Sequence, residues 1–250
     1  MTRPVGPPWR YYGGKWRASR LYEPPRHGLI IEPFAGAAGY ACHYHTRDVL
    51  LVDANPQVVT AWQWLIDATR SDVMALPPSL EYGVPVESLG LPVGATMLLR
   101  WWCNDGAATA CRSPSKWAAA NGWNTATRQR TAALAEAVSH WSVMLGTYRD
   151  APDVEASWFV DPPYQGCAGS HYKVGSDTID YDDLASWCLS REGDVTVCEG
   201  PRADWLPFRP FATIKASESK TGGKRSVERV WTNYEPAQAS LFSAGLPGGG

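Results

Sequence analysis

The chain has 250 residues, enough to bury one substantial core, and hydrophobic residues make up 44% of it. That fraction excludes general disorder. The formal net charge of −2 excludes attraction of the whole surface to a polyanion, so any contact with a nucleic acid has to come from local basic clusters. We expect one α/β domain that carries an inserted smaller piece.

Membrane and metal-binding signals are missing from the sequence. No apolar run approaches the ~20 residues of a membrane helix, and residues 1–10 contain no apolar signal-peptide segment. We therefore expect a cytoplasmic protein without a membrane partner. The six cysteines form no Cys-x-x-Cys pair, which favours free thiols over a disulfide framework. The segment Cys42-His43-Tyr44-His45 lacks a second ligand pair at zinc spacing, so we expect no metal site.

A glycine turn opens the informative part of the chain. In Tyr11-Tyr12-Gly13-Gly14-Lys15 the two glycines permit a tight turn or close approach to a ligand. Residues 27–32 then form a predicted buried strand that runs into Pro33-Phe34-Ala35-Gly36-Ala37-Ala38-Gly39, after which helical spacing begins. A strand, a glycine turn and a helix start place backbone N–H groups against a ligand.

The spacing of Gly36 and Gly39 is too tight for the dinucleotide fingerprint, which favours a smaller adenosine-type ligand. The competing interpretation is a glycine turn needed only for packing. A second predicted strand, residues 48–52, ends in Asp53 and leads into a helix over residues 58–67. An acid at this position binds ribose hydroxyls, whereas Asn55 is suited to capping the helix, and both roles are compatible.

Residues 76–149 interrupt the βα pattern. Residues 76–95 are rich in loop formers, residues 95–104 and 128–145 have helical patterns, and residues 104–130 are polar, basic and broken by glycine. We predict an inserted helical and loop target-recognition region over 76–149, between catalytic segments 1–75 and 150–236. The tryptophans of this region favour nucleic-acid contact, although a solvated face is the alternative for each basic cluster. They are Trp101, Trp102, Trp117 and Trp123.

The tetrapeptide Asp161-Pro162-Pro163-Tyr164 follows a predicted strand over residues 156–160. Proline carries no N–H, so two in succession end the ladder and fix the backbone rigidly. The carboxylate and a proline carbonyl can both accept hydrogen bonds from an exocyclic amino group, while the aromatic ring stacks on a heterocycle. This segment therefore predicts a site for a planar molecule with an amino group.

The last third predicts a loop over residues 166–177 that carries Tyr172, a helix over 181–189 and a strand over 194–199. Two edge strands, residues 211–215 and 227–231, then form a predicted hairpin with a basic, glycine-rich tip suited to phosphate contact. Residues 237–250 are predicted to be a disordered tail.

Four motifs in this order resemble the Dam-like (D12 class) DNA adenine methyltransferases: Tyr12-Gly13-Gly14-Lys15, the segment 32–39, Asp53-Ala54-Asn55 and Asp161-Pro162-Pro163-Tyr164. The resemblance implies S-adenosylmethionine as donor, with S-adenosylhomocysteine as product and no metal. It implies a Rossmann-like methyltransferase sheet with helices on both faces, a small helical DNA-recognition insertion and a C-terminal β-hairpin. The implied reaction is methyl transfer to N6 of a flipped-out adenine in double-stranded DNA, by a monomer or by a dimer on DNA.

The resemblance also assigns roles to residues. The implied catalytic residues are Asp161, Pro162, Pro163 and Tyr164. The implied donor-binding residues are Tyr11, Tyr12, Lys15, Pro33, Phe34, Ala35, Gly36, Ala37, Gly39, Asp53 and Asn55. The implied contacts to the target base and to DNA are Tyr172, Arg112, Lys116, Arg128, Lys220, Lys224 and Arg225.

Two departures from the family pattern leave questions open. Residues 104–130 do not show the family's usual recognition-loop sequence, so the target site stays undetermined, as does a role in restriction-modification or phage DNA modification. Cys198-Glu199-Gly200 stands where relatives carry Ser-Asn or a similar pair. The alternatives are a cytosine-N4 methyltransferase and a non-catalytic DNA-binding or donor-sensing module. Protein-glutamine and RNA methyltransferases are disfavoured because their tetrapeptide commonly begins with Asn.

Overall fold

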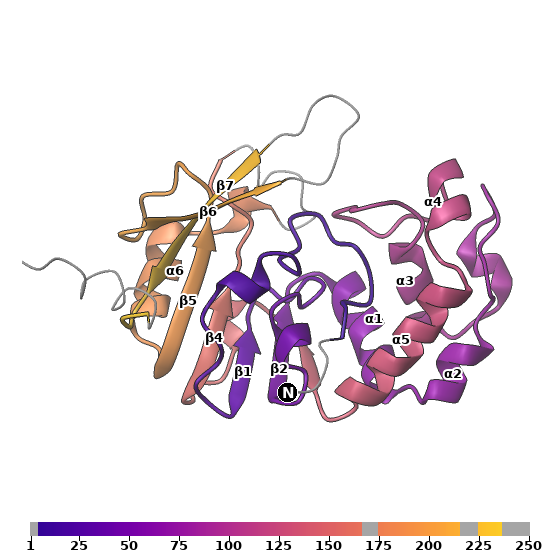
Figure 1. Cartoon of the computed structure of the whole chain (residues 1–250), viewed down its shortest axis with the longest axis horizontal. Coiled ribbons are helices and arrows are strands. Elements are labelled where there is room, and N and C mark those ends of the chain that lie inside the picture. The colour runs from indigo at the N-terminus through magenta and orange to yellow at the C-terminus, as the bar shows by residue number, and fades with distance from the viewer. Residues whose placement is uncertain (1–4, 167–174, 216–224, 237–250) are drawn as a thin grey trace, which may run out of the picture.

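The computed structural model describes residues 5–166, 175–215 and 225–236. Within these ranges the protein is an α/β structure built on a mixed, mostly parallel sheet of seven strands, in the order β3-β2-β1-β4-β5-β7-β6 (Figure 1). The strands are β1 Leu29–Glu32, β2 Asp48–Asp53, β3 Ser142–Leu145, β4 Ala156–Val160, β5 Gly193–Glu199, β6 Arg209–Lys215 and β7 Arg225–Thr232. The pairs on either side of β7 are antiparallel and the other pairs are parallel. The predicted α/β class is confirmed, and the arrangement is compatible with a Rossmann-like fold.

Hydrophobic clusters cover both faces of the sheet. Successive residues of a strand point to opposite faces, so neighbours in β1 belong to different clusters. Ile30 packs into one hydrophobic cluster together with α1 (Pro56–Asp67), α3 (Val93–Trp101) and α5 (Thr125–Val138). Its neighbour Ile31 packs into a second cluster with α6 (Tyr181–Leu189). Figure 1 shows α1 to α5 gathered beside β2, and α6 beside β5.

The helix α1 follows from local sequence. Asn55 accepts a hydrogen bond from the Gln57 N–H, Pro56 occupies the first turn, and the buried residues recur at helical spacing. Those buried residues are Val58, Ala61, Trp62, Leu65 and Ile66. The predicted cap at Asn55 is therefore confirmed, and α1 holds the rest of the helical region against the sheet.

The region between α1 and β3 also contains α2 (Arg70–Ala75), the short 3₁₀ segment Val86–Leu89 and α4 (Lys116–Asn121). The predicted insertion, 76–149, thus includes β3, a strand of the sheet. Three of its tryptophans are buried core residues and are not available to stack on bases: Trp101, Trp102 and Trp123. Trp117 on α4 is 43% exposed.

Three secondary-structure predictions were wrong in detail. The turn after β1 leads into a short 3₁₀ helix, Ala41–Tyr44, where an α-helix was predicted. Residues 142–145 form β3 and not the end of a helix, because a short apolar run fits either structure by periodicity alone. The strand β7 lies between β5 and β6, so only β6 is an edge strand of this pair.

The predicted tail, the hairpin tip over 216–224 and the loop residues 167–174 lie outside the described residues. In the part of the chain that is described, no helix has the length and apolar character required to cross a membrane.

Candidate active site

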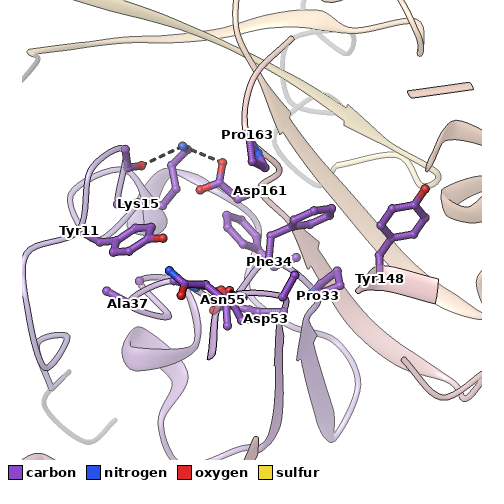
Figure 2. A pocket seen from close by; sticks show the side chains of 18 of the residues that line it. Tyr11, Lys15, Pro33, Phe34, Ala37, Asp53, Asn55, Tyr148, Asp161 and Pro163 are labelled. Atoms are coloured by element: carbon purple, nitrogen blue, oxygen red, sulfur yellow. Dashed lines mark hydrogen bonds and ion pairs between the residues drawn. The ribbon is translucent and has the colours of Figure 1, made fainter. Parts of the chain in front are cut away.

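A pocket opens at the carboxyl ends of β1, β2, β3 and β4. In the sheet, β2 and β3 lie on one side of β1 and β4 lies on its other side, so the order of the strands reverses at β1. Open α/β sheets bind ligands at the carboxyl ends of the strands beside such a switch point. The empty space of the pocket is about 970 Å³, including the part open to solvent. Every residue predicted to bind the donor lines it, together with Asp161 and Pro163 of the tetrapeptide (Figure 2).

The glycine turn after β1 forms the floor of the pocket. Gly36 has φ +47°, a conformation that favours glycine, and its carbonyl accepts a hydrogen bond of 2.9 Å from Trp62 Nε1 on α1. A Cβ on Gly39 would lie 2.6 Å from the backbone nitrogen of Trp16. The packing interpretation therefore holds for Gly39, because the absence of a side chain lets the segment that carries Lys15 approach the turn. The ligand interpretation of the turn stays a prediction.

Asp53 joins this turn to the end of β2. Its Oδ2 accepts a hydrogen bond of 2.8 Å from the Gly36 N–H, and its Oδ1 accepts one of 2.8 Å from the Asn55 N–H. Burial raises the pKa of Asp53 to about 6, against the opposing effect of these two N–H donors. Each carboxylate oxygen keeps a further lone pair, so the two backbone contacts leave room to accept a hydroxyl.

Asp161, directly after β4, faces Lys15 from the N-terminal turn. Lys15 Nζ lies 2.8 Å from Asp161 Oδ1 and donates a hydrogen bond of 3.1 Å to the Gly13 carbonyl (Figure 2). The lysine side chain is only 7% exposed. Burial raises the pKa of Asp161 to about 6, the Lys15 charge lowers it, and Glu228 raises it further. The pair thus joins the predicted donor motif to the predicted catalytic motif.

The backbone of the tetrapeptide is held from two sides. The Pro163 carbonyl accepts a hydrogen bond of 2.6 Å from the hydroxyl of Tyr181 on α6. The N–H of Gln165 donates a bond of 3.0 Å to Glu199 Oε1 at the end of β5, and burial raises the pKa of Glu199. Glu199 therefore anchors the chain just after the tetrapeptide.

Some pocket residues were missed by sequence reasoning. Glu32 is 3% exposed and accepts a 2.6 Å hydrogen bond from the Ala41 N–H, and burial raises its pKa to about 8. Residues 147–149 after β3, and Ile179 just before α6, also line the pocket. Recognition of β3 as a strand would have predicted the first of these groups, because its carboxyl end lies beside that of β2.

Glu228 on β7 is a further residue that sequence reasoning missed. Its Oε2 accepts a hydrogen bond from the Tyr164 hydroxyl and lies 3.9 Å from Lys15 Nζ. Glu228 is 6% exposed and shares its strand face with the buried Val230. An acidic residue at an inward position of a strand was the signal available in the sequence.

The residues predicted to contact DNA have different environments. Arg112 is exposed and lies 4.0 Å from Glu87, and exposed Lys116 lies 5.8 Å above the Tyr82 ring. Arg128 donates a 2.7 Å hydrogen bond to the Leu76 carbonyl, so its guanidinium ties α5 to the end of α2. The Arg225 backbone pairs with Lys215, and its side chain lies outside the described part, as do Tyr172, Lys220 and Lys224.

Neither a scan against protein-family models nor a search of curated proteins finds a match to this chain. Across the described ranges, no group of three or more His, Cys, Asp or Glu side chains is placed to hold a metal ion.

Proposed function

We propose that the protein is a DNA adenine-N6 methyltransferase of the Dam-like class, with S-adenosylmethionine as methyl donor and double-stranded DNA as substrate. The observation that carries the proposal is the position of Asp161 in the same pocket as the glycine turn and Asp53. Methyl transfer requires the donor and the acceptor to be held side by side in one site.

The residues fit such a donor. Asp53 is placed to accept hydrogen bonds from ribose hydroxyls at the end of β2, beside the turn at Gly36. Phe34 and Ile179 supply an apolar wall for a heterocycle. S-adenosylmethionine supplies an electrophilic methyl group on a sulfonium, which is a good leaving group.

Asp161 and the Pro162 carbonyl act on the other substrate. An adenine amino nitrogen is a weak nucleophile because its lone pair is delocalised into the ring. By accepting hydrogen bonds from the two amino hydrogens, these two oxygens favour a pyramidal nitrogen whose lone pair points out of the ring plane. Asp161 then accepts the proton that the nitrogen loses when the N–C bond forms and the bond between the methyl group and sulfur breaks. Asp161 is an acceptor when ionised, which its pKa of about 6 allows at neutral pH.

The target base has to leave the duplex to reach Asp161, at a cost of a few kcal/mol. Stacking on the Tyr164 ring offsets part of that cost. The exposed cations Arg112 and Lys116 are the described candidates for contacts to the DNA backbone.

Labelled donor and unmethylated DNA, followed by digestion to nucleosides, test the proposal directly. We expect label in N6-methyl-2′-deoxyadenosine. Label in N4-methylcytosine would instead identify a cytosine enzyme, and DNA without label would favour a donor-sensing or DNA-binding module.

Asp161→Ala tests the catalytic assignment. We expect methyl transfer to fall about 100-fold or more, because a group that orients the nucleophile is lost, while donor affinity measured by calorimetry is retained. Asp204→Ala is the matched control, since Asp204 is exposed. Near-normal turnover of Asp161→Ala on DNA would contradict the assignment.

A further inference from the structure

Glu228 brings a second acidic group to the tetrapeptide, beside the pocket. It reaches the site from β7, whereas Asp161 and Tyr164 follow β4 and Lys15 belongs to the N-terminal turn. The carboxylate of Glu228 accepts the Tyr164 hydroxyl and lies 3.9 Å from Lys15 Nζ. Lys15 Nζ also lies 2.8 Å from Asp161 Oδ1, so one ammonium group faces two carboxylates.

The contact with Tyr164 fixes the orientation of the ring. Lys15 Nζ lies 4.7 Å from the Tyr164 ring centroid, and a Cβ on Gly200 would lie 3.1 Å from the ring edge. The ring is thus bounded on two sides, and the hydrogen bond from its hydroxyl to Glu228 restrains its far end. A ring restrained in this way presents its face to a stacked base in a fixed orientation.

We propose that Glu228 is a positioning residue for the target base, which restrains the Tyr164 ring and shares the charge of Lys15 with Asp161. The inference rests on the proposed function, since it names a residue that supports the acceptor end of that same site. The sequence motifs do not contain Glu228, and its role follows from the pairing of β7 with β5.

The shared ammonium has a measurable electrostatic consequence. Burial raises the pKa of Asp161, Lys15 lowers it and Glu228 raises it. Glu228→Gln removes the negative charge that competes with Asp161 for Lys15, while the amide oxygen can still accept a hydrogen bond from the Tyr164 hydroxyl. The pKa of Asp161 should therefore fall.

The fall should be smaller than the change that burial or Lys15 causes, because Glu228 has the weakest of these effects on the pKa of Asp161. Among the residues that the structure describes, the other titratable groups whose pKa responds to Asp161 are unchanged in this variant. They are Glu32 on β1, Cys198 and Glu199 on β5, and the tyrosines Tyr22 and Tyr164.

The first test is the pH profile of kcat/KM for methyl transfer to DNA. In Glu228→Gln we expect the acidic limb to move to lower pH, because Asp161 stays ionised at lower pH. Glu235→Gln, at an exposed glutamate just after β7, should leave the limb in place. An acidic limb that does not move in Glu228→Gln would overturn the electrostatic part of the inference.

The second test does not need activity. Carboxyl chemical shifts of ¹³C-labelled aspartate, with Asp161 assigned by loss of its signal in Asp161→Asn, report the titration in the protein alone. We expect the same downward shift in Glu228→Gln. If the wild-type protein transfers no methyl group but the titration moves, the proposed function fails and the charge coupling stands. If methyl transfer occurs and the titration does not move, the inference alone fails.

Removal of the hydrogen-bond acceptor tests the restraint on the ring. We expect Glu228→Ala and Tyr164→Phe each to lower kcat about 10-fold with the donor KM retained, and the double variant to be no worse than the more impaired single variant. Glu228→Gln should recover most of the loss seen in Glu228→Ala at a pH above the acidic limb. Additive losses, or a loss confined to the donor KM, would contradict a role through Tyr164.

Discussion

The close approach of two backbones at Gly39 gives a prediction with a defined geometry. In Gly39→Ala the new Cβ would lie 2.6 Å from Trp16 N, 3.0 Å from the Lys15 carbonyl carbon and 3.2 Å from Lys15 N. These are backbone atoms, so a change of rotamer cannot relieve the contact. The segment that carries Lys15 therefore has to move away from the glycine turn.

The cost follows from the overlap. Ordinary contacts of a Cβ begin at 3.4 Å, so the segment has to shift by several tenths of an ångström, and overpacking of this kind costs about 1–3 kcal/mol. The shift also strains the hydrogen bond of 2.9 Å from Ser19 Oγ to the Gly39 carbonyl and moves Lys15 relative to Asp161. We therefore expect a lower melting temperature and donor binding weakened by about 10-fold or more.

Thermal unfolding and calorimetric titration with S-adenosylhomocysteine measure the two effects. The matched control is Gly28→Ala, because a Cβ at Gly28 has no atom within 4 Å and its backbone φ does not favour glycine. If Gly39→Ala has the same melting temperature and the same affinity for S-adenosylhomocysteine as Gly28→Ala, then neither stability nor binding depends on the close packing of the two turns, and the prediction is wrong.

Two further substitutions test local features of the same pocket. Burial raises the pKa of Glu32 from 4.5 to about 8. The free energy of unfolding therefore falls as the pH rises from 4.5 to about 8, because the buried carboxyl group has to ionise. The total fall is at most roughly 5 kcal/mol. Glu32→Gln should remove this loss, and its melting temperature relative to wild type should increase with pH over that window; a constant difference would contradict the buried acid. Asn55→Ala removes the cap of α1 and should cost about 1 kcal/mol in denaturant unfolding, whereas Asn55→Asp, which keeps an acceptor, should retain most of that stability.

The parts of the site that sequence predicted are those encoded by short local patterns. A buried strand followed by a glycine turn, an acid at the end of a second strand and Asp161 after a third each lie in adjacent residues. Because parallel strands end at the same edge, these three segments come together once the strands pair. The cap at Asn55 is local for the same reason, since its partner Gln57 is two residues away.

The remaining features depend on contacts between distant segments. The pairing of Lys15 with Asp161 requires the N-terminal turn to fold over β1 and β4, which no local pattern specifies. Burial of Trp101 and Trp123 depends on segments far away in the sequence: the Trp101 ring stacks on Trp9 with 5.5 Å between centroids, and Trp123 Nε1 donates a hydrogen bond to the Pro77 carbonyl. Their proximity in sequence to basic residues carried no information about exposure.

The direction of β7 explains why its acidic residue reaches the site. The strand runs antiparallel to β5, with Glu199 opposite Arg229 and Cys198 opposite Val230. The beginning of β7 therefore lies at the carboxyl end of β5, the edge at which Asp161 follows β4, and Glu228 precedes the residue opposite Glu199. A strand in the parallel direction would bring its own last residues to this edge and continue into a loop. The antiparallel direction instead presents Glu228 from within a paired strand, whose backbone hydrogen bonds hold the carboxylate against Tyr164 more rigidly than a loop would.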